Sequence, residues 1–462
     1  MSFLPYFSAE TWTLLALLIT LIVVYGYWPY GVFTKMGIPG PKPLPYFGTM
    51  LEYRKGFTNF DTECFQKYGR IWGIYDGRQP ALCIMDKSMI KTILIKECYN
   101  IFTNRRNLRL NGEMFDSLFV AEDDAWRRIR SVLSPSFTSG RLKEMFGIMK
   151  QHSANLLNGM KKQADKDQTI EVKEFFGPYS MDVVTSTAFS VDIDSLNNPS
   201  DPFVSNVKKM LKFDLFNPLF LLKLFSCSLS FFLSLSLSLS LSLSLSLSLS
   251  LSPSLPPSTG LTDHEILSQA MIFIFAGYET SSSSMSFLAY NLATNPHTMT
   301  KLQEEIDTVF PNKASIQYES LRLYPVAPRL ERVAKKTVEI NGIIIPKDCI
   351  VLVPTWTLHR DPEIWSDPEE FKPERFSKEN KESIDPYTYM PFGAGPRNCI
   401  GMRFALIMIK LAMVEILQSF TFSVCDETEV RRSPEQTEYD IIKHQDLFQH
   451  GQHLFYHGQH LF

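Results

Sequence analysis

The stretch Phe392-Gly393-Ala394-Gly395-Pro396-Arg397-Asn398-Cys399-Ile400-Gly401 sets one cysteine in a glycine-rich loop. An apolar run from Met402 to Phe420 follows the loop and predicts a helix. Because glycine tolerates backbone conformations that other residues resist, the loop can turn tightly. A helix start lowers the pKa of a nearby thiol and directs backbone N–H groups at its sulfur, so we expect Cys399 to be a thiolate that binds a metal. The plainer alternative is a free core cysteine beside a surface arginine.

Composition narrows the classes of function. The chain has 462 residues, of which 45% are hydrophobic, and its formal net charge is −3. This length fits one large domain or two to three ordinary ones, and the near-neutral charge gives no argument for nucleic-acid binding. The cysteines are scattered without CxxC pairs, which is typical of a reducing compartment. They are Cys64, Cys83, Cys98, Cys227, Cys349, Cys399 and Cys425.

The N-terminal segment predicts a membrane anchor. No charged residue occurs from Thr11 to Thr34, and Trp12 to Trp28 is almost wholly apolar with aromatic residues at both ends. Basic residues follow this run, so the positive-inside rule places the rest of the chain in the cytosol. A cleavable signal peptide is the alternative, but the segment lacks a basic start and a small-residue cleavage site. The proline-rich stretch from Gly37 to Pro45 cannot be helix and predicts a stiff hinge.

Several segments of the remaining chain have clear local signals. Residues 70–85 predict a hairpin that turns at Asp76-Gly77, and residues 124–133 predict a helix. A long apolar helix over residues 261–296 should begin with a capping box of Thr262 and Glu265. It contains Ala276-Gly277-Tyr278-Glu279-Thr280, where the threonine hydroxyl can bond the carbonyl four residues back and loosen the helix.

The pair Glu319 and Arg322 has the spacing that puts both charges on one helical face. This E-x-x-R pattern is common and says little by itself. Its position between the threonine-containing helix and the cysteine loop is what gives it meaning.

Taken together, the cysteine loop, the Ala276–Thr280 motif and the E-x-x-R pair resemble the cytochrome P-450 family. Residues 102–106 (FTNRR), 134–146 (SPSFTSGRLKEMF), 195–199 (SLNNP), 273–280 (FIFAGYET) and 390–405 resemble its vertebrate 3A subfamily. The resemblance covers roughly residues 4–225 and 261–422. It implies a mainly α fold with small β-sheets behind an N-terminal transmembrane anchor.

The resemblance also implies roles for individual residues. Cys399 would be the axial ligand of haem b (iron protoporphyrin IX), with Phe392 shielding its sulfur. Glu279 and Thr280 would deliver protons, while small Ala276 and Gly277 let the helix pass close over the haem face. The haem propionates would be held by Arg105, Trp126, Arg130, Arg332 and Arg397. Glu319, Arg322 and Arg375 would form a buried charge network. The substrate pocket would be lined by Arg106, Leu108, Phe119, Ile272, Phe275, Ala276, Ala327 and Arg329.

The activity that follows is that of a haem-thiolate monooxygenase which hydroxylates or dealkylates steroids and lipophilic foreign compounds. Its electrons would come from NADPH through a membrane-bound NADPH–cytochrome reductase, with cytochrome b5 as a further candidate donor. The enzyme would lie on the endoplasmic-reticulum membrane and face the cytosol. Two alternatives stay open: a haem-thiolate isomerase or peroxygenase that needs no reductase, and a non-catalytic membrane-anchored product that never holds haem.

Three features depart from the family pattern. Residues 233–252 are ten consecutive Leu-Ser pairs, which a CT dinucleotide repeat would encode, so we hypothesise read-through of non-coding sequence. Only residues 316–324 around Glu319 look helical, about 13 Å at the usual rise. The polar C-terminal tail repeats HGQHLF; histidine tracts can bind metal, but a disordered end is the simpler interpretation. The expected segments are the anchor (1–34), the hinge (35–48), the first part of the haem domain (49–225), the insert (226–260), the second part (261–425) and the tail (426–462).

Overall fold

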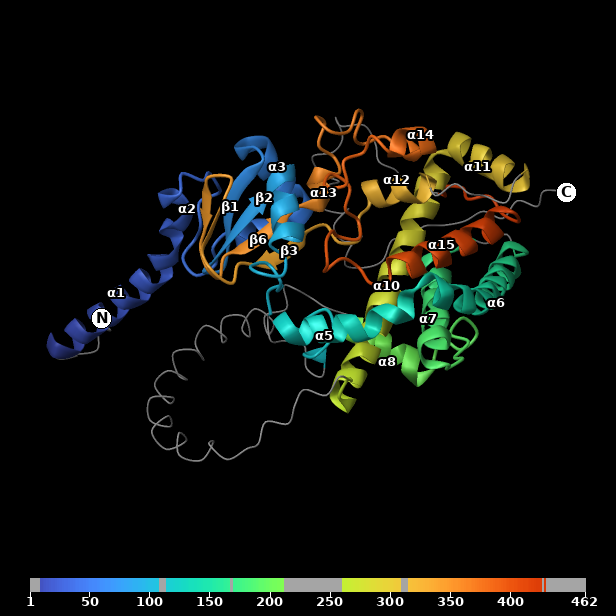
Figure 1. The fold of residues 1–462 in the computed structure, drawn as a ribbon, viewed down its shortest axis with the longest axis horizontal. Helices are drawn as coiled ribbons and strands as arrows, with labels where there is room; N and C mark the ends of the chain where they lie inside the picture. Colours follow the sequence, from blue (N-terminus) through green and yellow to red (C-terminus); the bar gives the residue numbers. More distant parts are fainter. Residues whose placement is uncertain are drawn as a thin grey trace, which may run out of the picture.

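The computed structural model describes residues 9–107, 114–166, 169–211, 260–308, 315–425 and 428. The described chain is mainly helical with two small sheets, as the sequence predicts. One part contains the sheets and the N-terminal helix, and the other contains most of the helices (Figure 1). Three predictions fall outside the described residues: the position of Leu108, the Leu-Ser repeat, and the polar tail with its duplicated histidine motif.

The sheet part begins with the predicted hairpin. Strands β1 (Ile71–Asp76) and β2 (Gln79–Ile84) pair antiparallel, and Asp76 lies opposite Gln79 across the turn. The sheet order is β1-β2-β6-β3, in which β6 (Ile350–Val353) runs parallel to β2 and antiparallel to β3 (Leu330–Val333). All four residues of β6 are buried, which is expected for a central strand covered on both faces. A separate hairpin joins β4 (Val338–Ile340) to β5 (Ile343–Ile345).

Short helices surround this sheet and form one hydrophobic core with it. The core includes Trp72, Ile74 and Leu82 from the first hairpin and Phe60 from α3. The elements of this part are α2 (Val32–Lys35), α3 (Phe57–Tyr68), α4 (Lys87–Lys91) and α13 (Thr355–Leu358), with 3-10 helices η1 (Trp28–Gly31) and η2 (Met50–Lys55) and a π-helical turn η3 (Thr92–Lys96).

The helical part is built around α10 (Asp263–Thr294), which runs through it from α8 (Pro202–Leu211) to α12 (Ser315–Leu323) (Figure 1). The predicted capping box is confirmed, because Thr262 and Glu265 each accept a backbone N–H of the other. The helix packs most extensively against α7 (Lys173–Phe189). The other elements are α5 (Asp123–Leu133), η5 (Ser134–Phe137), α6 (Ser139–Ala164), α11 (Pro296–Thr308), η6 (Pro373–Phe376), α14 (Lys378–Lys381) and α15 (Met402–Leu417).

A second hydrophobic core joins residues from both sides of the 226–260 segment. Phe176 of α7, Met285 of α10 and Met408 of α15 are fully buried and belong to one cluster. Segments far apart in the sequence therefore form one body around α10. This core packs α15, which begins where the cysteine loop ends, against the helix that bears Thr280.

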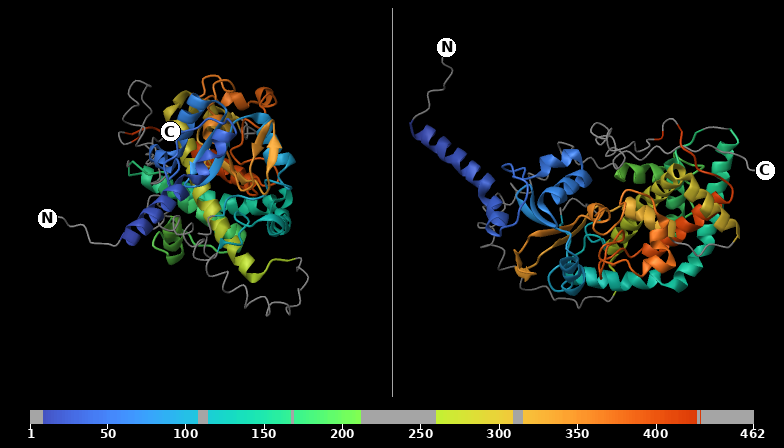
Figure 2. Two further views of the ribbon diagram at one scale, coloured as in Figure 1. Left: turned by 90° about the vertical axis from the view of Figure 1, so that its left-hand side faces the viewer. Right: turned by 90° about the horizontal axis from the view of Figure 1, so that it is seen from above.

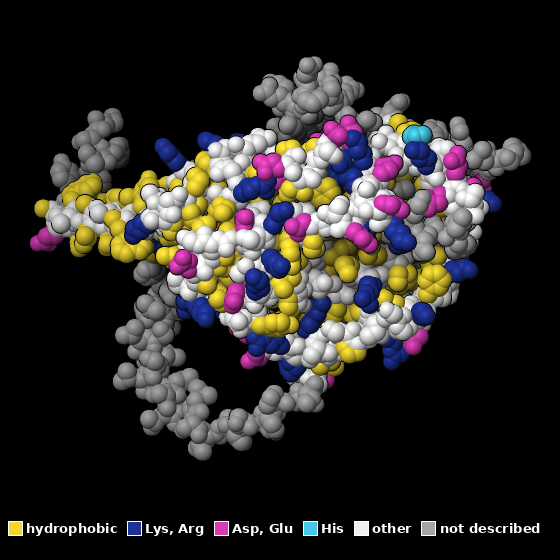
Figure 3. Space-filling view, turned by 45° about the horizontal axis from the view of Figure 1, so that its top comes forward, with side chains coloured by type: hydrophobic (Ala, Val, Ile, Leu, Met, Phe, Trp, Pro, Cys, Tyr) yellow, Lys and Arg dark blue, Asp and Glu magenta, His cyan; other side chains and the backbone are white. Residues whose placement is uncertain are grey.

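Helix α1 (Ala9–Tyr27) projects away from this body, at the end farthest from the helical part (Figures 1 and 2). Residues Ala9–Lys35 are long and apolar enough to cross a membrane, in agreement with the predicted anchor. Hydrophobic side chains cover the projecting helix (Figure 3). Its last turn contacts the sheet part, because Gly26 is buried against Tyr46 and the Arg78 guanidinium lies 3.4 Å from the centre of the Tyr25 ring.

Candidate active site

The glycine-rich loop turns where its sequence predicts. Gly393 and Gly395 have φ angles of +73° and +76°, a region that favours glycine. A Cβ atom on Gly395 would also lie 2.0 Å from the carbonyl oxygen of Leu94, so only glycine fits this close approach. The loop closes on itself through the Cys399 N–H, which donates to the carbonyl of Phe392 at 2.9 Å. The cysteine side chain is left exposed three residues before α15 begins.

The protonation of Cys399 differs from the prediction. Burial among the surrounding protein atoms raises the pKa of the thiol above its ordinary value, although one side of the residue is open to solvent. The backbone N–H of Gly401 and the charges of Arg130 and Arg105 act in the opposite direction but do not prevail. The helix start therefore acts in the predicted direction, but burial outweighs it in the protein alone. A cation bound at the sulfur would favour the thiolate.

Arginines from four separate segments converge beside this loop. Arg105 donates to the carbonyls of Phe119 (3.1 Å) and Arg397 (3.3 Å). Arg130 of α5 donates to the backbone and side-chain oxygens of Asn398, both at 3.0 Å. Arg397 itself donates to the carbonyls of Thr103 and Ala121, and its guanidinium lies 5.0 Å from the ring centre of Trp126.

The electrostatics of this cluster fit an anionic ligand. Burial, and then the charges of Arg332 and Arg397, hold the pKa of Arg105 well below its ordinary value. Burial likewise lowers the pKa of Arg397 to about 10, with Arg332 as the next cause, and it lowers those of Arg332 and Arg130. The buried Nε atoms of Arg332 and Arg397 have no hydrogen-bond partner within the described residues. Crowded guanidinium groups beside an exposed cysteine match the donor set that a haem with two propionates requires.

The Ala276–Thr280 motif lies in the middle of α10. The Thr280 hydroxyl donates to the carbonyl of Ala276, as predicted, and both residues are exposed although much of the following helix is buried. Glu279 is not free: Lys173, the first residue of α7, lies 2.7 Å from its Oε1 atom. No local pattern indicates this lysine, because it lies 106 residues away in the sequence.

Gly277 packs closely against α7. A Cβ atom on Gly277 would lie 2.5 Å from Cγ2 of Val184 in α7. The glycine is therefore required by the close packing of α10 on α7. That Gly277 also makes room at the haem face stays a prediction, and Ala276, one residue earlier, lies on the exposed side of the helix.

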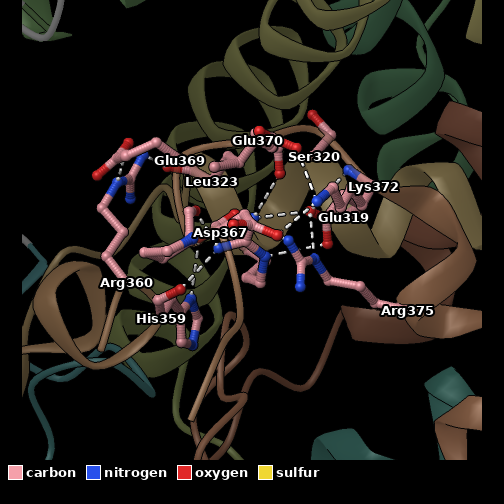
Figure 4. Close-up of polar contacts among 12 residues, drawn as sticks. Glu319, Ser320, Leu323, His359, Arg360, Asp367, Glu369, Glu370, Lys372 and Arg375 are labelled. Atoms are coloured by element: carbon pink, nitrogen blue, oxygen red, sulfur yellow. Dashed lines mark hydrogen bonds and ion pairs between the residues drawn. The ribbon is translucent and has the colours of Figure 1, made fainter. Parts of the chain in front are cut away.

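The predicted charge network is formed (Figure 4). Glu319 and Arg322 are fully buried, and the Arg375 side chain is 12% exposed. The Glu319 carboxylate accepts from Nε and Nη2 of Arg322 at 3.0 and 2.7 Å, and Arg375 lies 3.4 Å from its Oε1 atom. Arg322 also donates to the carbonyls of His359, Pro368 and Glu370. The helix is as short as predicted, yet Glu319 keeps its partners, because the Lys372 backbone N–H also donates to its Oε1 atom, at 3.1 Å. The carbonyls of residues 359–370 hold Arg322 in place beside it.

The predicted pocket residues fall into two groups. Phe119 and Ala327 are exposed, and Ile272 and Phe275 are half-buried along α10. The two arginines are instead held in ion pairs. Arg106 pairs with Asp76 (2.6 Å) and Glu331 (2.7 Å). Arg329 pairs with Asp61 (2.6 Å), and its guanidinium lies near the rings of Tyr53 and Phe57. Their contribution to a substrate pocket stays a prediction.

The chain is similar in sequence to known proteins over most of its length. The family model Cytochrome P450 matches residues 38–237 and 245–451. Cytochrome P450 3A27 of Oncorhynchus mykiss is 80% identical, with 93% of this chain and 92% of the relative covered. Cytochrome P450 3A29 of Sus scrofa is 50% identical, with 93% and 94% covered. A protein of Mesocricetus auratus named lithocholate 6-beta-hydroxylase is 48% identical over the same shares.

Proposed function

Because the chain belongs to the cytochrome P450 family, we propose that it is a haem-thiolate monooxygenase acting on steroids and lipophilic xenobiotics. It hydroxylates or dealkylates them with O2 and with electrons that originate from NADPH. The observation that carries this proposal is one exposed cysteine beside arginines whose burial depresses their pKa values.

The cofactor in this proposal is haem b, which Cys399 would bind through its sulfur, with Phe392 beside that sulfur. Arg105, Trp126, Arg130, Arg332 and Arg397 would hold its propionates. A haem bound through a cysteine thiolate supplies oxygen-activating chemistry, because the thiolate donates electron density that favours O–O cleavage. The backbone hydrogen bond within loop 392–401 fixes the main chain at Cys399, so the residue that would bind the cofactor stands on an ordered turn.

Proton delivery is assigned to Glu279 and Thr280. Lys173 holds the Glu279 carboxylate at 2.7 Å and so keeps one oxygen in a fixed place. The Thr280 hydroxyl is oriented by the Ala276 carbonyl, to which it donates. An oriented carboxylate and hydroxyl one residue apart can pass a proton along the exposed side of α10.

The substrate pocket is proposed to be apolar. Its lining comprises Arg106, Leu108, Phe119, Ile272, Phe275, Ala276, Ala327 and Arg329. An apolar lining with few polar groups suits lipophilic ligands. A relative named for lithocholate hydroxylation supports a steroid-like substrate.

The proposed electron donors are NADPH–cytochrome reductase and cytochrome b5. The proposed location is the endoplasmic-reticulum membrane, with the catalytic body in the cytosol. Helix α1 supports a membrane location by its length and apolar composition. Lys35, Lys42, Arg54 and Lys55 follow this helix, which favours the cytosolic orientation.

The first test is a reduced carbon-monoxide difference spectrum of the full chain in membranes. We expect the red-shifted Soret band of a thiolate-bound haem. Cys399→Ser should abolish it, whereas Cys425→Ser, a change at a half-buried cysteine outside the loop, should retain it. Absence of the band in the wild-type chain would contradict the proposal and support a product that never holds haem.

A second test separates monooxygenase from reductase-independent chemistry. We expect hydroxylated lithocholate only when both NADPH and the reductase are added. Product formed from peroxide alone, with none formed from NADPH, would favour the peroxygenase alternative. An isomerised substrate without net oxidation would favour the isomerase.

A further inference from the structure

The amide of Gln269 connects α10 to a distant backbone segment. Its side chain is buried with 3% exposure. Its Oε1 atom accepts the backbone N–H of Leu118 at 2.6 Å, and its Nε2 atom donates to the carbonyl of Asp116 at 2.9 Å. A second donation, to Glu265 at 3.0 Å within α10, fixes the rotamer of the amide. One side chain therefore satisfies two backbone groups of a non-helical segment 151 residues away.

The same segment reaches the arginine cluster at its other end. Phe119 directly follows Leu118, and its carbonyl accepts from Arg105 at 3.1 Å. The Arg105 guanidinium also lies 4.5 Å from the centre of the Phe119 ring. Leu118 packs into a small core with Trp126 and Ile400, the residue after Cys399. The backbone of residues 116–119 is thus held between α10 and the cysteine loop.

A neighbouring contact secures the start of this segment. His264, in the first turn of α10, lies 3.0 Å from a carboxylate oxygen of Asp116. Its ring centre is 4.6 Å from that of Phe115. These contacts are partly exposed, whereas the Gln269 contacts are buried. A buried amide that loses its partners leaves unsatisfied backbone groups, so Gln269 is the stronger restraint.

We propose that Gln269 is a positioning residue that sets where Phe119 stands and, through it, which site on a lipophilic substrate is oxidised. The inference rests on the proposed monooxygenase function. The ring of Phe119 is 55% exposed, with Arg105 near it, so an open part of the ring can meet a ligand. Because Leu118 and Phe119 are consecutive, a shift of the Leu118 backbone displaces the ring.

The test compares two amide-to-leucine variants of α10 in the full-length, haem-loaded protein. Gln269→Leu removes both contacts to residues 116–118. Asn291→Leu is the matched control, because Asn291 is also 3% exposed and also makes a contact between elements, donating to Ser320 Oγ at 3.1 Å. The readouts are amide hydrogen exchange of residues 114–121, and the ratio of hydroxylated products from lithocholate as the probe substrate.

We expect faster exchange of residues 114–121 and a product ratio changed by roughly threefold or more in Gln269→Leu, since small displacements of a positioned group alter rates strongly. The carbon-monoxide band should remain, and Asn291→Leu should leave both readouts at the wild-type level. Should Gln269→Leu not fold, Gln269→Glu replaces it, because a carboxylate still accepts the Leu118 N–H but cannot donate to the Asp116 carbonyl.

A double variant tests whether the effect passes through Phe119. If it does, Gln269→Leu should change the product ratio little in a Phe119→Ala background. An unchanged ratio in the single variant, or an equal change in both backgrounds, would overturn the inference while the proposed function stands. A wild-type protein that yields no hydroxylated lithocholate would instead reject the proposed function, and the inference with it.

Discussion

Lys173 restrains the carboxylate that the proposed proton path depends on. Its ammonium group lies 2.7 Å from Glu279, and the two side chains are 22% and 38% exposed. We expect Lys173→Met to lower the yield of product per NADPH consumed by roughly 3- to 10-fold, less than the 10²-fold or more typical of removing a proton donor itself. The measurement is the ratio of hydroxylated product to NADPH oxidised, with hydrogen peroxide as the expected by-product.

The control for this variant is Lys335→Met. Lys335 is 28% exposed and pairs with Asp123 at 2.6 Å, so the two lysines have similar surroundings. Because Lys335 pairs with Asp123 and not with Glu279, Lys335→Met should leave the yield of product per NADPH unchanged. An unchanged yield in Lys173→Met would mean that Glu279 needs no fixed position.

His359 makes the stability of the protein depend on pH. Its ring is fully buried, accepts the Met390 N–H at 2.9 Å, and lies 3.3 Å from the Arg322 carbonyl. Burial, and then the charges of Arg322 and Arg360, lower the pKa of His359 to about 3. In the unfolded chain the ordinary value is about 6.5, so the unfolded state binds the proton first as the pH falls. The stability that His359 contributes as a neutral ring is therefore fully present above pH 6.5 and is lost progressively as the pH falls towards 3.

The measurement is the free energy of unfolding between pH 7 and pH 5, a window above the titration of most carboxyl groups. His359 should contribute a loss of up to about 1.4 kcal/mol per pH unit below 6.5. His359→Leu should be less stable at pH 7 but should lack this part of the slope. His297→Gln changes an exposed histidine and serves as the control. Equal slopes in wild type and His359→Leu would show that this ring is not the source.

At the scale of elements, α10 packs closely on α7 at Gly277. Alanine is favoured over glycine in a helix by about 1 kcal/mol, yet its Cβ would lie 2.5 Å from Val184. Val184 has a stiff β-branched side chain, so we expect Gly277→Ala to destabilise the fold by about 1–3 kcal/mol. Chemical denaturation of the single variants and of Gly277→Ala with Val184→Ala is the measurement.

The double variant should be more stable than the sum of the single effects, because the smaller side chain leaves room for the added methyl group. Strict additivity would show that the two helices can separate at this point. The change in α10 would then be local, and the glycine would have no packing role.

The elements that the sequence predicts best are those whose signals are local. The β1–β2 hairpin follows from a turn between two apolar runs, and the start of α10 from two capping residues three positions apart. Partners from distant segments were not predictable: neither Lys173 beside Glu279 nor Gln269 beside Leu118 has a local pattern. The resemblance supplied the contact of Glu319 with Arg375, which spacing alone could not.

Two further features have the same cause. A helical pattern does not say which element packs against which side, so the contact of Gly277 with Val184 is not predictable from the sequence. For Cys399, the sequence shows the helix start that lowers the pKa but not the burial that raises it. Contacts across the fold decided both cases.

At the scale of the whole molecule, α1 differs from every other helix of the described chain in its surroundings. Leu17, Leu18 and Leu21 are 55%, 53% and 57% exposed, and the contacts of α1 with Tyr46 of the sheet part come from Ile22 onwards. A helix with this many exposed leucines is unfavourable in water and favourable in a bilayer. At the usual rise the 19 residues of α1 span about 28 Å, which is close to the hydrocarbon thickness of a membrane.

We expect Leu17→Lys combined with Leu18→Lys to release the full-length protein from membranes, because a lysine at the centre of a spanning helix costs about 2.5–3.5 kcal/mol. The measurement is the fraction that remains in the membrane pellet after alkaline extraction. Ile344→Lys is the matched control, since Ile344 is 55% exposed and lies on β5, outside α1. The Ile344→Lys protein should stay in the pellet. Because α1 contributes little to either hydrophobic core, the released protein should keep its carbon-monoxide band. A double-lysine variant that still pellets would mean that surfaces other than α1 hold the body at the membrane.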